Sequence, residues 1–161
     1  DRSAREVPRD EAPRRGEVEG SDEPGGPQSP RSAHGLVPRP GDQMLPLGTV
    51  AHARSGDKGG DANVGVWIPA DHPRRESAAA WLVDLLDDAT VRDLLPEAAD
   101  LDVDIHPLPN LAGVNIVIHG LLGEGVASST RLDPQAKALG EWLRARHVHI
   151  PTHLTTGGPH R

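Results

Sequence analysis

The sequence predicts a two-layer α+β domain: a four-stranded, mainly antiparallel sheet with helices on one face, in the order ββαββα. Three observations favour this class. Four segments carry the apolar pattern of strands, two longer segments carry apolar residues at helical spacing, and the strands come in consecutive pairs. Consecutive strands form antiparallel hairpins, whereas a doubly wound parallel sheet needs a helix between successive strands.

The first pair of strands flanks a glycine-rich segment. Residues 47–54 alternate towards a strand, and in residues 61–68 the side chains of Val64, Val66 and Ile68 share one face. The residues between the two strands carry several charged and amide side chains. We therefore expect an antiparallel hairpin whose loop does more than connect two strands.

Helices follow each pair of strands. Residues 75–87 place apolar side chains at the i, i+3, i+4 and i+7 spacing of an amphipathic helix. A short second helix is expected to stop at Pro96, because proline lacks the N–H that a helix interior needs. Asp133–Pro134 predicts the start of the last helix, with Asp at the N-cap and Pro at the first helical position. This helix is expected to end near His147.

The second pair of strands lies between these helices. Residues 101–108 alternate between apolar and polar side chains, which predicts one buried face and one solvated face. Residues 111–119 are almost continuously apolar, as is typical of a central strand covered on both sides. Asn115 interrupts this apolar run, and a buried amide needs hydrogen-bonding partners.

Three regions are expected along the chain. Residues 1–45 are rich in Pro, Gly and charged residues and show no apolar period, which predicts a disordered extension. A segment that docks to a partner is the alternative for this region. Residues 46–147 form the folded domain, and residues 148–161 are expected to be a fraying C-terminal tail.

The composition excludes several classes of function. The net charge is −7 and no run of Lys or Arg is present, so nucleic-acid binding is not expected. The chain has no Cys, which excludes disulfides, thiolate catalysis and iron–sulfur clusters. No stretch approaches the roughly 20 apolar residues of a membrane span, and the first residues do not resemble a signal peptide. We therefore expect a cytoplasmic protein that does not cross a membrane.

Several short motifs occur in one order along residues 46–146. The motifs are Ala53–Gly59, Asn63–Gly65, Leu108–Asn110, Val114–Val117, Gly120–Gly123 and Arg131–Asp133 with Lys137. Together they resemble the ferredoxin-fold domain of the acyclic terpene utilisation (AtuA) family, which forms the C-terminal part of larger proteins and also occurs as a small free-standing protein. The resemblance implies a ferredoxin-like fold, a link to acyl-CoA and acyclic terpenoid breakdown, and a partner that is a larger AtuA-like chain or a second copy.

The candidate ligand-binding site is centred on the hairpin. Glycine N–H groups with Arg54 and Lys58 form a potential anion site, for which a CoA ester is the expected ligand, although the P-loop spacing is absent. A network of carboxylate, amide and lysine groups is a second hypothesis, and local pairing of Asp57 and Asp61 with the two cations is the structural alternative. The candidate residues are Arg54, Ser55, Gly56, Asp57, Lys58, Gly59, Asn63, Asn110 and Asn115.

No cofactor and no metal site is predicted. His147, His149, His153 and His160 have ligand-like spacing, but they lie in the expected tail, and metal sites need rigid support. Three further histidines fall on predicted strands and are expected to be ordinary strand residues: His52, His106 and His119. Trp67 is a candidate interface residue, with a core or rim position as its alternative.

We expect an accessory or subunit domain that assembles with itself or with a larger AtuA-like protein. It would contribute the polar hairpin to a shared site linked to acyl-CoA or acyclic terpenoid catabolism. The alternative is a stand-alone enzyme or binder that acts on an acyl-CoA or a terpenoid acid. No nucleophile–base pair stands out in the sequence, so no catalytic residue is assigned and enzymatic activity stays open.

Overall fold

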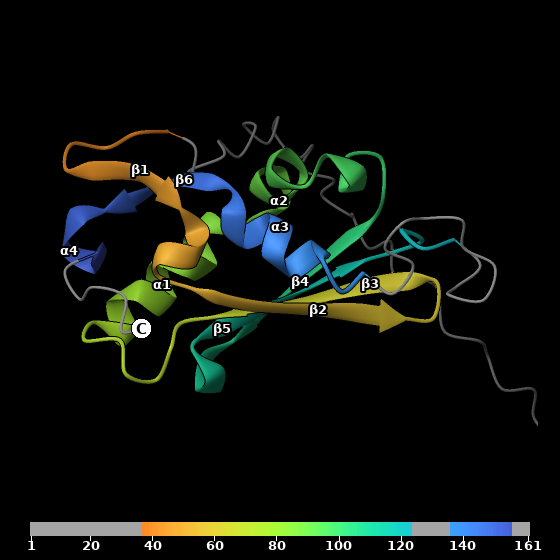
Figure 1. Cartoon of the computed structure of the whole chain (residues 1–161), viewed down its shortest axis with the longest axis horizontal. Helices are drawn as coiled ribbons and strands as arrows, with labels where there is room; N and C mark the ends of the chain where they lie inside the picture. Colours follow the sequence, from red (N-terminus) through yellow and green to blue (C-terminus); the bar gives the residue numbers. More distant parts are fainter. Residues whose placement is uncertain (1–36, 124–135, 156–161) are drawn as a thin grey trace, which may run out of the picture.

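The computed structural model describes residues 37–123 and 136–155. Its main feature is a four-stranded antiparallel sheet in the order β2-β3-β5-β4 (Figure 1). Every pair of neighbouring strands is antiparallel. The strands are β2 (His52–Lys58), β3 (Asp61–Trp67), β4 (Val103–Leu108) and β5 (Gly113–Ile118).

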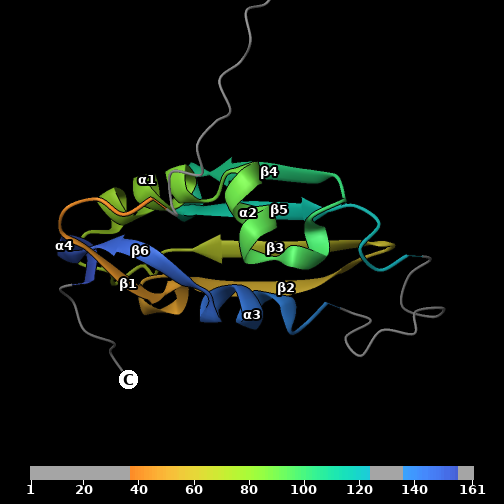
Figure 2. The ribbon, with the colours of Figure 1, turned by 90° about the horizontal axis from the view of Figure 1, so that it is seen from above.

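Three helices lie over one side of this sheet, which confirms the predicted α+β class with its ferredoxin-like layering. Figure 2, drawn from that side, shows them across the strands. They are α1 (Arg75–Leu85), α2 (Asp88–Leu94) and α3 (Leu139–Ala145), with the 3-10 helices η1 (Leu47–Thr49), η2 (Pro96–Ala98) and η3 (Pro109–Leu111) in the connections.

Strand alternation decides which side chains form the core. Val64 and Val66 on β3 and Ile116 on β5 are buried beneath the helices. Leu82 from α1 and Leu143 from α3 belong to the same buried cluster. Burial of each large aliphatic side chain stabilises the fold by roughly 1.5–3 kcal/mol. The opposite side of each strand is thereby turned away from the helices.

The two ends of the domain are joined by a second sheet that the sequence did not predict. Strand β1 (Asp42–Pro46) pairs antiparallel with β6 (His147–Pro151), and α4 (Thr152–Thr155) follows. The expected extension through residue 45 and the expected tail from residue 148 therefore contain strand residues. These residues form strands because Val148 and Ile150, which alternate along β6, are fully buried. Residues 1–36 and 156–161 lie outside the described parts of the chain.

The predicted hairpin is present, but its strands and loop differ from the expectation. Residues 47–49 form η1, because Leu47 is buried and its N–H is bonded to the Arg146 carbonyl, so the first strand begins only at His52. The connection to β3 is limited to Gly59 and Gly60. Gly59 has φ 69°, which favours glycine in a tight turn. Residues 55–58, expected in the loop, are paired strand, whereas Arg54 and residues 61–63 lie in strands as predicted.

The last helix begins later than its sequence signal. Ala136 has φ 52°, in the left-handed region, and a helix cannot continue through it. Helix α3 starts at Leu139, and the expected N-cap at Asp133–Pro134 lies outside the described residues. A Cβ on Gly140 would lie 3.2 Å from the backbone nitrogen of Ser55, so this glycine allows α3 to approach β2 closely.

Candidate functional site

The side of the four-stranded sheet that faces away from the helices, called here the open face, carries most of the predicted polar residues. Directly paired residues of neighbouring strands point to the same side of a sheet. Arg54 pairs with Gly65, and Gly65 pairs with Asn115. Because their chain neighbours Val64 and Val66 are buried under the helices, these three residues belong to the open face.

Five of the predicted residues share this open face. Arg54 and Lys58 are exposed, and neither forms a direct ion pair with another described residue. Lys58 lies opposite Asp61 in the strand register, and its charge contributes to lowering the pKa of that carboxyl. Gly65 lies between Arg54 and Asn115 in one cross-strand row, so no side chain stands between these two residues. Their backbones are two strand spacings apart, about 10 Å. The five residues are Arg54, Gly56, Lys58, Asn63 and Asn115.

The structure separates the other predicted residues from this group. Ser55 and Asp57 alternate with the open-face residues and so lie on the side of the helices. Gly59 is in the turn. Asn110 is in η3, beyond the opposite end of the sheet, and the five steps of β5 alone span about 17 Å. One small-molecule site therefore does not include both Asn110 and Lys58.

Ser55 has a structural role that the sequence did not indicate. Its hydroxyl oxygen accepts a hydrogen bond of 2.7 Å from the Gly140 N–H. The same hydroxyl can donate to the carbonyl oxygen of Ala136 or, at 3.2 Å, to that of Lys137. These contacts fix the start of α3 on β2 and leave Ser55 unsuited to ligand binding.

A carboxylate–histidine–carboxylate cluster lies at the turn end of the open face. The Nδ1 of His119 is 3.0 Å from Asp61 Oδ2, and its Nε2 is 2.9 Å from Asp104 Oδ2. The other carboxylate oxygen of Asp61 accepts a 2.8 Å hydrogen bond from the Gly120 N–H. Of the local pairing of Asp57 and Asp61 with Arg54 and Lys58, the structural alternative from the sequence, the charge of Lys58 acts on Asp61 from the opposite register position. The direct hydrogen bonds of Asp61 go to His119 and Gly120.

The cluster shifts the protonation of its members in a consistent direction. Hydrogen bonds that the ring donates, first to Asp104 and then to Asp61, raise the pKa of His119 above its ordinary value of 6.5. The Gly120 N–H, followed by His119 itself, lowers the pKa of Asp61 below 3.8. Each ring nitrogen faces a carboxylate oxygen, so the protonated ring can donate to both. The cluster links β3 and β4 to the residue that follows β5, and neither ring nitrogen is free to act as a base or nucleophile.

Local sequence patterns carry no signal for this cluster. Its three members are far apart in the chain, and each follows an ordinary strand pattern. They meet because β5 lies between β3 and β4 with Asp61 and Asp104 near the row of His119. The register of the three strands is the information that would have identified the site.

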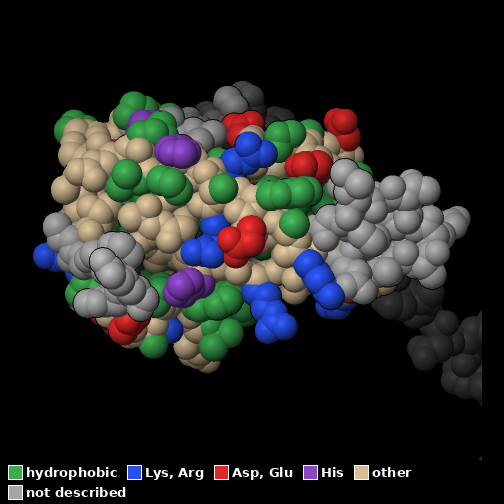
Figure 3. All heavy atoms as spheres, in the orientation of Figure 1, with side chains coloured by type: hydrophobic (Ala, Val, Ile, Leu, Met, Phe, Trp, Pro, Cys, Tyr) green, Lys and Arg blue, Asp and Glu red, His purple; other side chains and the backbone are tan. Residues whose placement is uncertain are grey.

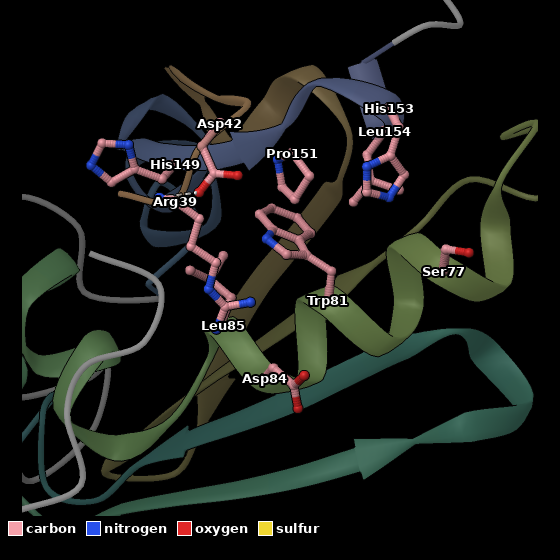
Figure 4. A pocket seen from close by; sticks show the side chains of 10 residues that line it. All are labelled: Arg39, Asp42, Ser77, Trp81, Asp84, Leu85, His149, Pro151, His153 and Leu154. Carbon is pink, nitrogen blue, oxygen red and sulfur yellow. Dashed lines mark hydrogen bonds between the residues drawn. The ribbon is translucent and has the colours of Figure 1, made fainter. Parts of the chain in front are cut away.

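The cavity drawn in Figure 4 lies elsewhere, between α1 and the β1–β6 sheet. It has a volume of about 240 Å³. The Trp81 indole lies against Pro151 at its centre, and Arg39, Asp42 and His153 are arranged around this pair (Figure 4). None of the predicted site residues lines it, so the open face and this cavity are separate regions.

Metal-ligating geometry is not found among the described residues. No group of three or more His, Cys, Asp or Glu side chains within residues 37–123 and 136–155 is arranged to hold a metal ion. His147 and His149 lie on β6, and His153 lies on α4, while His160 is outside the described range. On open-face strands, His52 contacts Trp67 with ring centroids 6.0 Å apart, and His119 is engaged by carboxylates.

Neither the surface drawn in Figure 3 nor the described helices have the features of a nucleic-acid-binding or membrane-spanning protein. On the side drawn in Figure 3, basic side chains lie among acidic, histidine and apolar ones and form no continuous basic area. The longest helix of the described segments has 11 residues. No helix there combines the length and the apolar character that a bilayer crossing requires.

A sequence model described as the AtuA ferredoxin-like domain matches residues 45–149. The chain belongs to this family. The matched range contains the whole AtuA ferredoxin-like sheet, with its open face and the Asp61–His119–Asp104 cluster, and it ends inside β6. It also confirms the resemblance drawn from the ordered motifs. Neither the curated proteins nor the solved structures gave a match.

Proposed function

We propose that this AtuA ferredoxin-like domain is an accessory subunit. It assembles with a larger AtuA-like protein or with a second copy and contributes its open face to a shared site. That site would serve acyl-CoA or acyclic terpenoid catabolism in the cytoplasm. A CoA ester is the proposed ligand, and its phosphates would meet Arg54 and Lys58.

The single observation that carries this proposal is the pair of exposed cations on the open face. Arg54 and Lys58 project from one strand about 13 Å apart, because four residues of strand separate them. Gly56 lies between them, and nothing approaches within 4 Å of the position its Cβ would take. An arginine binds a carboxylate or phosphate in a bidentate manner, and a lysine acts as a point charge.

An incomplete site is favoured over a self-sufficient one by the same arrangement. The cations, Asn63 and Asn115 lie on a sheet face, and none of them lines the cavity beside Trp81. Asp61 and Asp104 stand on the same face and oppose an anion. A partner surface would enclose the ligand and supply the missing contacts, including any nucleophile or base.

Co-purification with a co-expressed larger AtuA-like chain tests the proposal. We expect the wild-type domain to be retained by the tagged partner, or to form dimers by itself, and the Arg54→Ala, Lys58→Ala double variant to lose this association at least tenfold. Arg74→Ala, Arg146→Ala is the matched control, because it removes two exposed charges from outside the open face. Equal retention of the double variant and the wild type would show that the open face is not the contact.

The second candidate function is a stand-alone binder or enzyme for an acyl-CoA or a terpenoid acid. It is favoured by the same two cations, which are available to a ligand without any partner. Titration calorimetry of the isolated domain with an acyl-CoA distinguishes the two functions. Saturable binding that the double variant abolishes supports the stand-alone function, and binding only in the co-purified complex supports the accessory function.

A further inference from the structure

A groove of about 570 Å³ separates α1 from the turn between β4 and β5. Figure 2 shows α1 beside the end of β4 and the beginning of β5. The volume lies within the range of roughly 300–1,000 Å³ that is usual for small-molecule sites. The groove is on the side of the helices and shares no residue with the five-residue group on the open face.

The walls of this groove are mostly apolar and are shaped by small or rigid residues. Ala79 and Ala80 leave space along α1. Val83, further along the same helix, is 38% exposed. Pro107 and Pro109 form the facing wall, where fixed backbone angles limit rearrangement. A flexible aliphatic chain can lie between two such walls without requiring polar partners there.

One end of the groove holds a guanidinium group without a counterion. Arg75 lines the cavity, and its Nε is buried with no hydrogen-bond acceptor. Its side chain forms no ion pair within the described segments, although Glu76 is its chain neighbour. A buried donor without an acceptor is unfavourable, and a carboxylate satisfies a guanidinium through two parallel hydrogen bonds.

The other charged residues of the groove orient a ligand. Asp84 is nine residues further along α1, which places it about 14 Å from the Arg75 end. Glu76 is exposed to solvent, where its charge is screened. An anionic head is therefore favoured at Arg75 and disfavoured at the Asp84 end, so a ligand with one negative head and an apolar chain fits in one direction.

We propose that this groove binds a small aliphatic monocarboxylate. The carboxylate pairs with Arg75, and the chain lies along Ala79, Ala80 and Val83 against the two prolines. The assignment depends on the groove and on the unpaired guanidinium alone. It does not rest on the proposed accessory role, because its residues lie outside the open face.

Amide chemical-shift mapping of the full chain with octanoate tests this site. We expect saturable shifts confined to α1 and to the η3–β5 segment, and binding that weakens at least tenfold in Arg75→Gln. Arg74→Gln is the matched control, since it removes an adjacent exposed charge that does not line the groove, and it should bind octanoate as the wild type does. Ala80→Leu, at an exposed helix position, fills the groove and should also abolish binding while the protein stays folded.

Comparison with 1-octanol and octylammonium separates charge recognition from apolar contact. Weaker binding of both than of octanoate supports the site. Four results would each overturn the site. They are binding of 1-octanol as tight as that of octanoate, a loss of octanoate binding in Arg74→Gln equal to that in Arg75→Gln, chemical-shift changes on the open face, and the absence of saturation. Concentration-dependent shifts of the same amides without octanoate would overturn it as well, because a second copy would then occupy the groove.

Discussion

The hydroxyl oxygen of Ser55 on β2 accepts a hydrogen bond of 2.7 Å from the backbone N–H of Gly140 on α3, across 85 residues of sequence. Gly140 is the second residue of α3, where backbone N–H groups have no acceptor within the helix. The serine therefore caps the helix from a neighbouring strand. The absence of a Cβ on Gly140 permits the close approach on which this bond depends.

Replacement of Ser55 by alanine should destabilise the domain without removing a ligand contact. The Gly140 N–H would lose its acceptor in a partly buried position, which typically costs about 1–3 kcal/mol of unfolding free energy. Urea denaturation followed by circular dichroism measures the change. Ser77→Ala, at an exposed position of α1, is the control and should stay within about 0.5 kcal/mol of wild type. A Ser55→Ala protein as stable as the control would contradict the capping role.

Gly113 should tolerate no side chain. A Cβ there would lie 2.5 Å from the Val66 carbonyl oxygen and 2.9 Å from Trp67 Cβ, so the β3–β5 pairing would have to move. We expect Gly113→Ala to lower the unfolding free energy by about 3 kcal/mol or more. Gly56→Ala provides the contrast, because nothing lies within 4 Å of its added Cβ. If the two variants have the same melting temperature, the close packing at Gly113 is not as described.

The Asp61–His119–Asp104 cluster predicts a defined pH dependence of stability. The raised pKa of His119 stabilises the fold fully below 6.5, and this contribution disappears as the pH rises through the raised value. The lowered pKa of Asp61 stabilises the fold above 3.8, and this contribution disappears as the pH falls through the lowered value. The cluster therefore contributes most between these two ordinary values.

The variant His119→Gln isolates the histidine part of this dependence. Urea unfolding at several pH values between 5 and 9 should show a decline in wild type that the variant lacks. His106→Gln, an exposed histidine on the neighbouring strand β4, should retain the wild-type decline. Parallel pH curves for wild type and His119→Gln would mean that the two carboxylates do not act through this ring.

Arg92 is expected to stabilise the connection into β4 chiefly through backbone carbonyls. Its Nη1 lies 2.6 Å from the Leu101 oxygen and 2.9 Å from the oxygens of both Ala98 and Ala99. Nε and Nη2 of the same guanidinium bond Asp88. The single nitrogen of lysine cannot serve both sides, so Arg92→Lys should cost about 1–3 kcal/mol. Asp88→Asn removes only the exposed ion pair of the same arginine and should cost less than about 1 kcal/mol. Thermal unfolding of both variants distinguishes the two contributions. Equal losses of stability in the two variants would show that the backbone carbonyls are not the main partners of Arg92.

The candidate site was partly predictable because strand alternation is local. The alternation of Val64 and Val66 with Asn63 and Gly65 correctly predicts which residues of β3 face the helices. Asn115 was expected on a neighbouring strand, and it pairs with Gly65. The same alternation, extended through β2, would have placed Ser55 under α3, but the glycines of the hairpin favoured a loop there instead.

The Asp61–His119–Asp104 cluster and the β1–β6 pairing were not predictable from local patterns. Each depends on strands that meet at a particular register after long separations in sequence. A five-residue strand such as β6 has too few alternations to stand out from a polar tail. Its partner β1 has mostly exposed or half-buried side chains, so burial marks it weakly.

The sequence by itself determined the number and order of the main elements, the family, and the apolar sides of α1 and β3, because these depend on residue periodicity and on short motifs. Only the tertiary structure decided that residues 55–58 are paired strand before a two-residue turn, that Ser55 caps α3, and that Arg54 and Lys58 share an open face. The physical reason is that local patterns select conformations, whereas strand register and helix packing select which distant side chains meet.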